Sequence, residues 1–357
     1  NLERVGAGIS AGTTYRVVMK SLPSLPLLEH VLGATGTRAV MGFHQPFLNA
    51  LIERRPDVDV LLGKPMPVAA AERFYRELRG PFERIQWLID TRERLAQYRE
   101  LARGLGLRLR VNLEIDVGLH RGGFEPDAAF VAALRSVAET PEHLELAGFM
   151  GYDAHIGKLP GFLGDRAFRA ARDRYEAFAT LARRTTSAAL ERALTFNAAG
   201  SLTYRRYHGD PLVNDISAGS CLVKPADFDT PHLADHEPAS FIATPVLKRA
   251  PGTPFPGLEW LSPLARAWDP NLAQTYFLYG GYWKAVHEAP PGLQTNAVYG
   301  RSTNQDLANA SASVPLEVDD FAFLRPTQSE SVFLQFGDLV VVRGSELVDR
   351  WAVLRQG

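Results

Sequence analysis

Residues 84–113, RIQWLIDTRERLAQYRELARGLGLRLRVNL, contain two short strand patterns joined by one helix pattern. The strand patterns, Arg84–Ile89 and Leu107–Leu113, are short runs rich in apolar residues. Between them, Thr91–Gly104 places apolar residues at the i, i+3 and i+4 spacing of a helix. Strands that alternate with helices are typical of parallel sheets. The segment therefore predicts a strand, a helix and a second strand parallel to the first.

The same alternation runs through the first 220 residues of the chain. The other predicted strands are Thr14–Met19, Arg38–Gly42, Val58–Leu62, Leu146–Gly151, Ala193–Asn197 and Val213–Ser217. The other predicted helices are Pro26–Leu32, Pro46–Arg54, Val68–Arg79, Pro126–Ala138 and Asp165–Arg184. Eight strands alternating with helices predict an α/β fold, a (β/α)8 TIM-type barrel; a doubly wound open sheet is the alternative.

The character of the sequence changes after about Lys224, where proline and glycine become dense. The strand-like runs that follow are Phe241–Leu247, Thr275–Leu278, Phe321–Leu324, Val332–Phe336, Leu339–Val342 and Leu347–Val353. Gly337-Asp338 and Gly344-Ser345 separate the last three runs as hairpin turns do. The sequence thus predicts a barrel domain over residues 1–224 and a mostly antiparallel β domain over residues 225–357.

The composition excludes several classes of protein. Of 357 residues, 46% are hydrophobic and 22% charged, and 39 Lys and Arg against 40 Asp and Glu give a net charge of −1. Such a balance argues against binding nucleic acid or a membrane surface by bulk charge. No apolar run is long enough to span a membrane. The single cysteine, Cys221, excludes an internal disulfide framework and a multi-cysteine zinc site, and it fits a cytoplasmic location.

Small and hydroxyl residues follow the last two predicted barrel strands, as Gly200-Ser201 and Gly219-Ser220. Active sites of such barrels lie at the carboxyl ends of the strands, and phosphate commonly binds after strands 7 and 8. Small residues let backbone N–H groups approach an anion closely, and a hydroxyl adds a donor. These positions therefore predict a phosphate site; an ordinary glycine–serine loop is the alternative.

Lys20 ends the first predicted strand and points its amine into the mouth of a barrel. Desolvation there would lower the pKa of the amine and make it a nucleophile able to form a Schiff base. A solvated lysine at a strand end is the alternative. A lysine together with a phosphate site is the arrangement that pyridoxal phosphate needs, because the lysine binds its aldehyde and the phosphate site binds its phosphate.

The segment Asp116–Phe124, DVGLHRGGF, matches an Asp-x-Gly-x-x-Arg-x-Gly pattern. On this motif the chain resembles the alanine racemase-like, fold-type III pyridoxal phosphate enzymes, and within them the D-threonine aldolase and D-serine dehydratase branch. The usual Arg-Pro-His-x-Lys of that branch is changed to RVVMK at Arg16–Lys20. Further matching segments are Gly148–Tyr152, Gly200–Tyr204 and Ala218–Ser220.

The resemblance implies roles for individual residues. Lys20 would carry the Schiff base, Arg121 would donate to the phenolic oxygen of the cofactor, and Tyr152 would lie against its ring. The residues implied in phosphate binding are Gly200, Ser201, Leu202, Gly219 and Ser220. The related enzymes build each site from two chains, so we also expect a homodimer.

The C-terminal segment departs from the branch at the metal site. FGDLVVVR at Phe336–Arg343 resembles the branch's ending, which follows a His-x-Cys or His-x-Asp metal pair. Here Gln328 and Glu330 occupy the ligand positions. An amide oxygen is a weak zinc ligand, so we expect no tightly bound zinc and at most a weak, oxygen-ligated divalent ion. Glu330 is then a candidate acid or base, with a surface carboxylate in a hairpin as the alternative.

The resemblance implies a lyase that acts on a β-hydroxy D-amino acid, by retro-aldol cleavage or β-elimination through an external aldimine. Its catalytic candidates are Lys20, Tyr152 and Glu330. The alternatives are a pyridoxal phosphate-dependent racemase, a non-catalytic pyridoxal phosphate-binding protein and an unrelated barrel hydrolase. The chain starts at Asn1 without Met, so we expect a preceding segment that holds the first part of the β domain.

Overall fold

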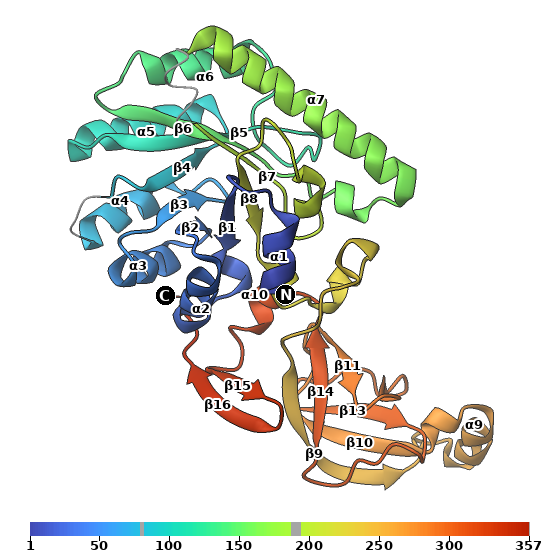
Figure 1. Ribbon diagram of the computed structural model, residues 1–357. Helices are drawn as coiled ribbons and strands as arrows, with labels where there is room; N and C mark the ends of the chain where they lie inside the picture. Colours follow the sequence, from blue (N-terminus) through green and yellow to red (C-terminus); the bar gives the residue numbers. More distant parts are fainter. Residues whose placement is uncertain (79–81, 187–193, 357) are drawn as a thin grey trace. The chain divides into compact units, whose positions relative to one another are not determined.

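The computed structural model describes residues 1–78, 82–186 and 194–356. Arg79 and Ala193, the predicted ends of a helix and a strand, lie outside the described residues. The chain divides into two units (Figure 1). Unit 1 consists of Asn1–Leu222, Thr230–His236 and Phe333–Gly357, and unit 2 consists of Val223–Asp229 and Glu237–Val332.

Unit 1 contains a closed barrel of parallel strands in sequence order, as predicted. Its strands are β1 Thr14–Val18, β2 Ala39–Gly42, β3 Asp59–Leu62, β4 Ile85–Ile89, β5 Leu109–Glu114, β6 Leu144–Gly151, β7 Thr195–Ala198 and β8 Asp215–Ala218. The barrel closes where β8 pairs with β1, with Thr14 opposite Asp215 and Val17 opposite Ala218. The doubly wound alternative is therefore wrong.

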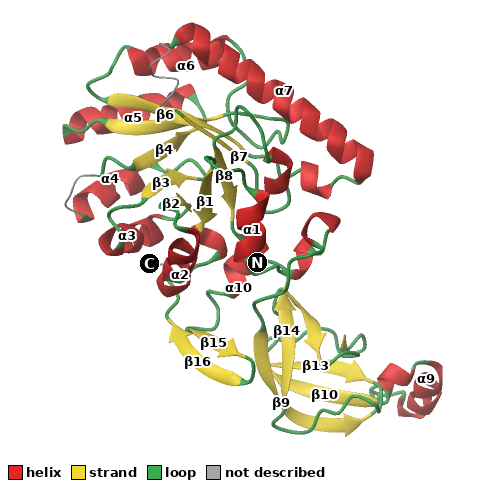
Figure 2. Ribbon diagram, viewed as in Figure 1, coloured by secondary structure: helices red, strands yellow, loops and turns green. Residues whose placement is uncertain are grey.

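Helices surround the strands of the barrel (Figure 2). They are α1 Leu2–Gly8, α2 Leu25–Thr35, α3 Gln45–Arg54, α4 Val68–Glu77, α5 Arg92–Leu105, α6 Ala128–Ala138 and α7 Gly161–Thr185. Helix α5 shows why their ends were predictable: the Thr91 side chain accepts the Arg94 N–H, and Gly106 ends the helix at φ 64°. Helix α1 was not predicted, because it is short and buries only Val5.

Short 3-10 turns occupy several connections of the chain. They are η1 Met19–Ser21, η2 Ile156–Lys158, η3 Tyr204–Tyr207, η4 Ser220–Leu222, η5 Ala226–Phe228, η6 Pro231–Leu233, η7 Glu259–Leu261 and η8 Pro270–Leu272. Two of them, η1 and η4, directly follow β1 and β8, which are neighbours in the barrel. Among the described residues, no helix is both long and apolar enough to cross a membrane.

Charged groups are buried and paired within unit 1. The Arg16 guanidinium lies 2.7 Å from an Asp215 carboxylate oxygen and 2.8 Å from an Asp59 oxygen, so it joins β1 to β8 and β3. Asn197 donates to the same Asp215. Buried charges of this kind are tolerated only when they are paired and hydrogen-bonded. The arginine of the altered RVVMK motif is thus a structural link between strands.

Unit 2 is built on a six-stranded antiparallel sheet in the order β11-β14-β9-β10-β13-β12. Its strands are β9 Ile242–Pro251, β10 Gln274–Tyr279, β11 Ala285–Ala289, β12 Gln294–Thr295, β13 Gln305–Ala310 and β14 Phe321–Pro326, and its helices are α9 Ser262–Trp268 and α10 Ser329–Val332. Tyr276, Val246 and Ala308 lie at the centre of its apolar core. The sequence missed β11, β12 and β13, which are rich in residues that strands usually avoid.

The last part of the chain corrects one prediction. Val332–Phe336 is not a strand: Val332 ends α10, and the rest is turn and bend before β15 Leu339–Arg343. The hairpin of β15 and β16 (Glu346–Trp351), turning at Gly344, agrees with the prediction. Residues 333–357 belong to unit 1, whereas the predicted boundary after residue 224 placed them with the β domain.

Candidate active site

Lys20 lies in η1, directly after β1. Because β1 pairs with β8, this turn lies beside the one that follows β8, and the Ser21 and Ser220 hydroxyl oxygens are 3.0 Å apart. Lys20 Nζ is 4.9 Å from the centroid of the Phe43 ring, which follows β2. Closure of the barrel therefore joins the predicted nucleophile and one predicted phosphate turn, although Ser21 and Ser220 are 199 residues apart in sequence.

The two predicted phosphate turns also contact each other. The Ser201 hydroxyl, after β7, accepts hydrogen bonds from the backbone N–H groups of Gly219 at 3.2 Å and Cys221 at 3.0 Å. Ser201 and Ser220 are both buried. The serine side chain of one turn thus holds the backbone of the other, so the two turns lie directly against each other.

Two glycines of these turns lie close to neighbouring atoms. A Cβ on Gly219 would lie 2.8 Å from the Val18 carbonyl oxygen, and one on Gly200 would lie 3.0 Å from the Tyr152 ring. The backbone N–H groups of Ser201 and Leu202 form no hydrogen bond with any described residue. Unpaired N–H groups beside two glycines form a cradle that fits a small anion.

The loop after β5 presents Arg121. The Asp116 carboxylate shapes this loop by accepting the N–H of Gly118 at 2.8 Å and of His120 at 3.1 Å. A Cβ on Gly123, which has φ 97°, would lie 3.0 Å from the Glu114 carbonyl carbon and oxygen, so a glycine suits this position. The Asp116–Phe124 motif therefore forms a loop whose shape depends on its aspartate and its glycines.

Arg121 and Tyr152 meet at the barrel mouth. The guanidinium carbon of Arg121 is 4.8 Å from the centroid of the Tyr152 ring, which is a cation–π distance. Tyr152 directly follows β6 and also packs against Gly200, so one ring contacts both the arginine loop and a phosphate turn. The loops after β1, β2, β5, β6, β7 and β8 are thus linked by successive contacts into one site, which holds Lys20, Arg121 and Tyr152.

Residues 1–226 match the family model described as "Alanine racemase, N-terminal domain". The chain belongs to this family. Pyridoxal phosphate is the cofactor of alanine racemase-like enzymes. No curated protein sequence matches the chain.

Solved structures in and around this family share the fold. D-threonine aldolase from Filomicrobium marinum is 16% identical, with a TM-score of 0.77 over 99% of this chain and 91% of its own. D-threo-3-hydroxyaspartate dehydratase from Delftia sp. HT23 is 15% identical, with a TM-score of 0.70 over 99% and 96%. Alanine racemase from Clostridium difficile 630 is 13% identical, with a TM-score of 0.72 over 98% and 94%. At these identities the likeness establishes the fold.

The residues at the barrel mouth fit the cofactor of the family. The unpaired N–H groups of Ser201 and Leu202, with the hydroxyl of Ser220, suit a phosphate, and Lys20 supplies the amine that an aldehyde needs. Gly219 leaves room where a Cβ would clash with the Val18 backbone, and Gly200 leaves room beside the Tyr152 ring. The donor set therefore agrees with the family assignment.

Glu114 is a further ionisable group at this site that the sequence did not single out. It ends β5 and is 7% exposed. Burial raises the pKa of Glu114 to about 7, the Asp90 and Asp116 carboxylates add to this effect, and Arg121 opposes it. The only available signal was its position at the end of a barrel strand. A carboxyl group that titrates near neutral pH suits proton transfer.

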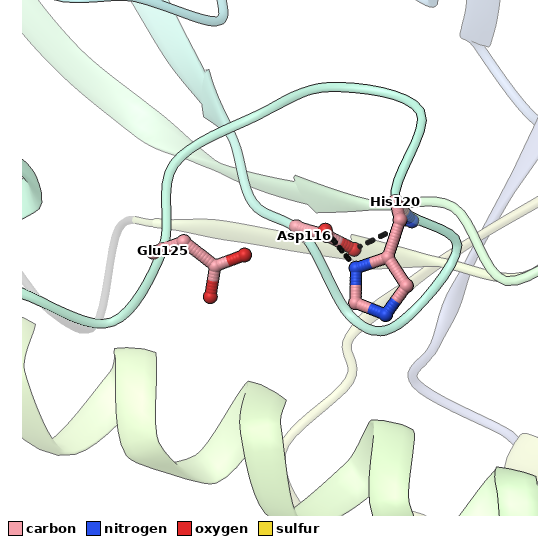
Figure 3. A group of neighbouring side chains, drawn as sticks. All are labelled: Asp116, His120 and Glu125. Atoms are coloured by element: carbon pink, nitrogen blue, oxygen red, sulfur yellow. Dashed lines mark hydrogen bonds and ion pairs between the residues drawn. The ribbon is translucent and has the colours of Figure 1, made fainter.

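Asp116, His120 and Glu125 form a cluster in the arginine loop (Figure 3). Their ligand atoms lie within 4.8 Å of one another, and His120 Nδ1 is 2.8 Å from Asp116. Burial raises the pKa of Asp116, but the hydrogen bonds from Gly118 and His120 outweigh it and leave the pKa below its usual value. Glu125 pairs with Arg174 of α7 at 2.5 Å. These bonds account for the position of all three side chains, which stabilise the loop.

Gln328 and Glu330, which the resemblance predicted at metal-ligand positions, belong to unit 2. Gln328 is exposed, and its amide donates to Asp227 at 3.1 Å. Glu330 lies in α10 and is half-buried, so the hairpin location is wrong. Unit 1 thus gathers all the predicted cofactor residues, whereas unit 2 carries the two that differ from the metal-binding branch.

Proposed function

We propose that the protein is a pyridoxal phosphate-dependent lyase that acts on a β-hydroxy D-amino acid, by retro-aldol cleavage or β-elimination. One observation carries the cofactor part of this proposal: barrel closure places the Lys20 turn beside the serine-lined turns after β7 and β8. The similarity to a D-threonine aldolase and a D-threo-3-hydroxyaspartate dehydratase over 99% of this chain supports the lyase part.

The proposed roles follow from the position of each residue. Lys20 binds the cofactor aldehyde, and the backbone N–H groups of Ser201 and Leu202 bind the phosphate together with Ser220. Arg121 would donate to the phenolic oxygen, and Tyr152 would lie against the ring. When bound, pyridoxal phosphate supplies an electron sink for the bond that breaks at the substrate Cα.

The β-hydroxyl of the substrate needs a group that takes its proton. We propose Glu330 for this role from the resemblance alone, because glutamine in place of histidine removes the strongest neutral metal ligand that the aldolase and dehydratase branch uses. Any divalent ion at Gln328 and Glu330 would be weakly held by oxygen ligands. Glu114, with its pKa near 7, is the second candidate for proton transfer.

Racemisation is the second candidate function. The match to "Alanine racemase, N-terminal domain" and the TM-score of 0.72 to an alanine racemase favour it. A racemase needs a second acid or base on the opposite face of the cofactor. We also propose a homodimer, from the resemblance, and a cytoplasmic location, from the single cysteine, Cys221.

Product analysis tests the proposal. The protein is loaded with pyridoxal phosphate and incubated separately with D-threonine, D-serine and D-alanine. Glycine plus an aldehyde indicates an aldolase, a keto acid plus ammonia indicates a dehydratase, and only L-alanine from D-alanine indicates a racemase. Binding of the cofactor with none of these products would leave the non-catalytic carrier as the better description, and failure to bind it would overturn the proposal.

A further inference from the structure

Asp153 is a buried carboxylate that directly follows Tyr152 and has no role in the site described above. Its side chain is 0% exposed. Its two oxygens accept hydrogen bonds from the hydroxyls of Thr203 at 2.7 Å and Tyr207 at 2.8 Å. Burying a carboxylate costs free energy unless it is hydrogen-bonded. The two hydroxyl donors offset this cost and hold Asp153 in place as a hydrogen-bond acceptor.

Thr203 is the last residue of the turn that begins at Gly200. Its hydroxyl accepts the Gly200 N–H at 3.0 Å, and its own backbone N–H donates to the Gly200 carbonyl at 3.0 Å. The turn is therefore closed from both ends by one residue. Because the Thr203 hydroxyl donates its hydrogen bond to Asp153, the lone pairs of the Thr203 oxygen remain to accept the Gly200 N–H.

This closure decides which N–H groups of the turn remain for a ligand. The Gly200 N–H is used by Thr203, whereas those of Ser201 and Leu202 form no bond with any described residue. Tyr152, the neighbour of Asp153, packs against Gly200. The segment 152–153 thus holds the turn at two points, one apolar and one through the hydroxyl of Thr203.

We propose that Thr203 and Asp153 are positioning residues that fix the Gly200–Thr203 turn, so that the protein selects the phosphorylated form of its cofactor over the unphosphorylated aldehyde. This inference rests on the proposed pyridoxal phosphate site. Neither residue touches the cofactor, since Asp153 acts through Thr203 and Thr203 acts through the backbone of the turn. The selectivity comes from two N–H groups that are already oriented before the phosphate arrives.

The other charged and titratable groups around Asp153 agree with this role. Burial raises the pKa of Asp153 to about 6, and the hydroxyls of Thr203 and Tyr207 and the charge of Arg206 oppose the rise. Each oxygen of Asp153 accepts a hydrogen bond from a hydroxyl group, which stabilises the ionised form. Arg206 is itself paired with Asp165 at 2.8 Å, and Arg172 pairs with Asp210.

The test compares Thr203→Val, which keeps the shape and removes the hydroxyl, with Thr203→Ser, which keeps the hydroxyl. Binding of pyridoxal phosphate and of pyridoxal is measured separately by absorbance titration. We expect Thr203→Val to weaken pyridoxal phosphate binding about tenfold, as for the loss of one hydrogen bond that orders a charged-ligand site, and to leave pyridoxal binding unchanged. Thr203→Ser should bind both as the wild type does.

Asp153→Asn provides a second variant, because its amide leaves one of the two hydroxyl donors without an acceptor. It should reduce the preference for pyridoxal phosphate, and it decides the question if Thr203→Val does not fold. An equal loss of both ligands, or an unchanged preference in both variants, would overturn the inference. If the wild-type protein binds neither ligand, the proposed function itself fails.

Discussion

The barrel mouth and the segment Arg325–Glu330 carry their chemistry in different ways. At the mouth, backbone N–H groups, two glycines and buried serines make the anion cradle, and barrel closure places Lys20 beside it. In Arg325–Glu330 the chemistry depends on single side chains, of which Gln328 is exposed and bonded to Asp227. A cradle built from backbone resists change, whereas an exposed side chain is easily replaced. The comparison therefore predicts that substitutions change binding most at the barrel mouth.

The largest expected effect comes from Lys20→Ala, which removes the only group at the mouth proposed to bind the cofactor aldehyde covalently. The borohydride-reducible adduct with pyridoxal phosphate and all detectable activity should disappear, while the melting temperature stays near that of the wild type. Mass spectrometry of the reduced protein measures the adduct. The control is Lys64→Ala, after β3; if that variant loses the adduct and Lys20→Ala retains it, the nucleophile is misassigned.

The backbone cradle is tested next by Ser201→Asp. A carboxylate about 4 Å from a phosphate charge costs about 4 kcal/mol at the effective dielectric constant of a protein surface, which is about a thousandfold in affinity. Ser201→Ala removes only the hydroxyl and should weaken binding far less. Titration with pyridoxal phosphate measures both. Equal affinities of the aspartate variant and the wild type would place the phosphate elsewhere.

A smaller loss of activity is expected from substitutions in the Arg325–Glu330 segment. Glu330→Gln should lower kcat about a hundredfold, since it removes the proposed proton acceptor. Treatment with a chelator should leave most of the wild-type activity. Gln328→His restores an imidazole and should make activity more dependent on a divalent ion. Glu317→Gln, a substitution of an exposed carboxylate, is the control. Wild-type activity that is abolished by chelation and restored by zinc alone would contradict this account.

The smallest effect concerns Glu114 and the pH dependence of stability. Its pKa of about 7 in the folded protein lies above its ordinary value, so folding binds a proton. The resulting stability is complete below about pH 4 and is lost as the pH rises through 7, amounting to about 3 kcal/mol at most. Denaturant unfolding at pH 5 and pH 8 should show a smaller decrease for Glu114→Gln than for the wild type. The exposed Glu100→Gln should behave as the wild type, and an identical decrease in all three proteins would refute the prediction.

The barrel strands were predictable because each is a short, buried, apolar run set between amphipathic helices, as in β4 and α5. The sheet of unit 2 was only partly predictable. β13, QDLANA, is rich in residues of low strand propensity, yet it is buried by pairing with β10. The prediction of a strand at Val332–Phe336 was wrong for the opposite reason. The segment is apolar, but Val332 ends a short helix and the residues after it form turns and bends.

The sequence by itself predicted the barrel, which the structure confirms, and it singled out Lys20, the arginine loop and the two small-residue turns as the candidate site. Each is a local pattern of strand ends, glycines and hydroxyl residues whose meaning depends on neighbours along the chain. Only the tertiary structure decided which groups meet. It placed the Ser21 and Ser220 hydroxyls 3.0 Å apart, used the Ser201 hydroxyl to hold the Gly219 N–H, and buried Asp153 behind Thr203. It also raised the pKa of Glu114 to about 7 by burial, an effect that exists only once distant strands have excluded water from the carboxyl group.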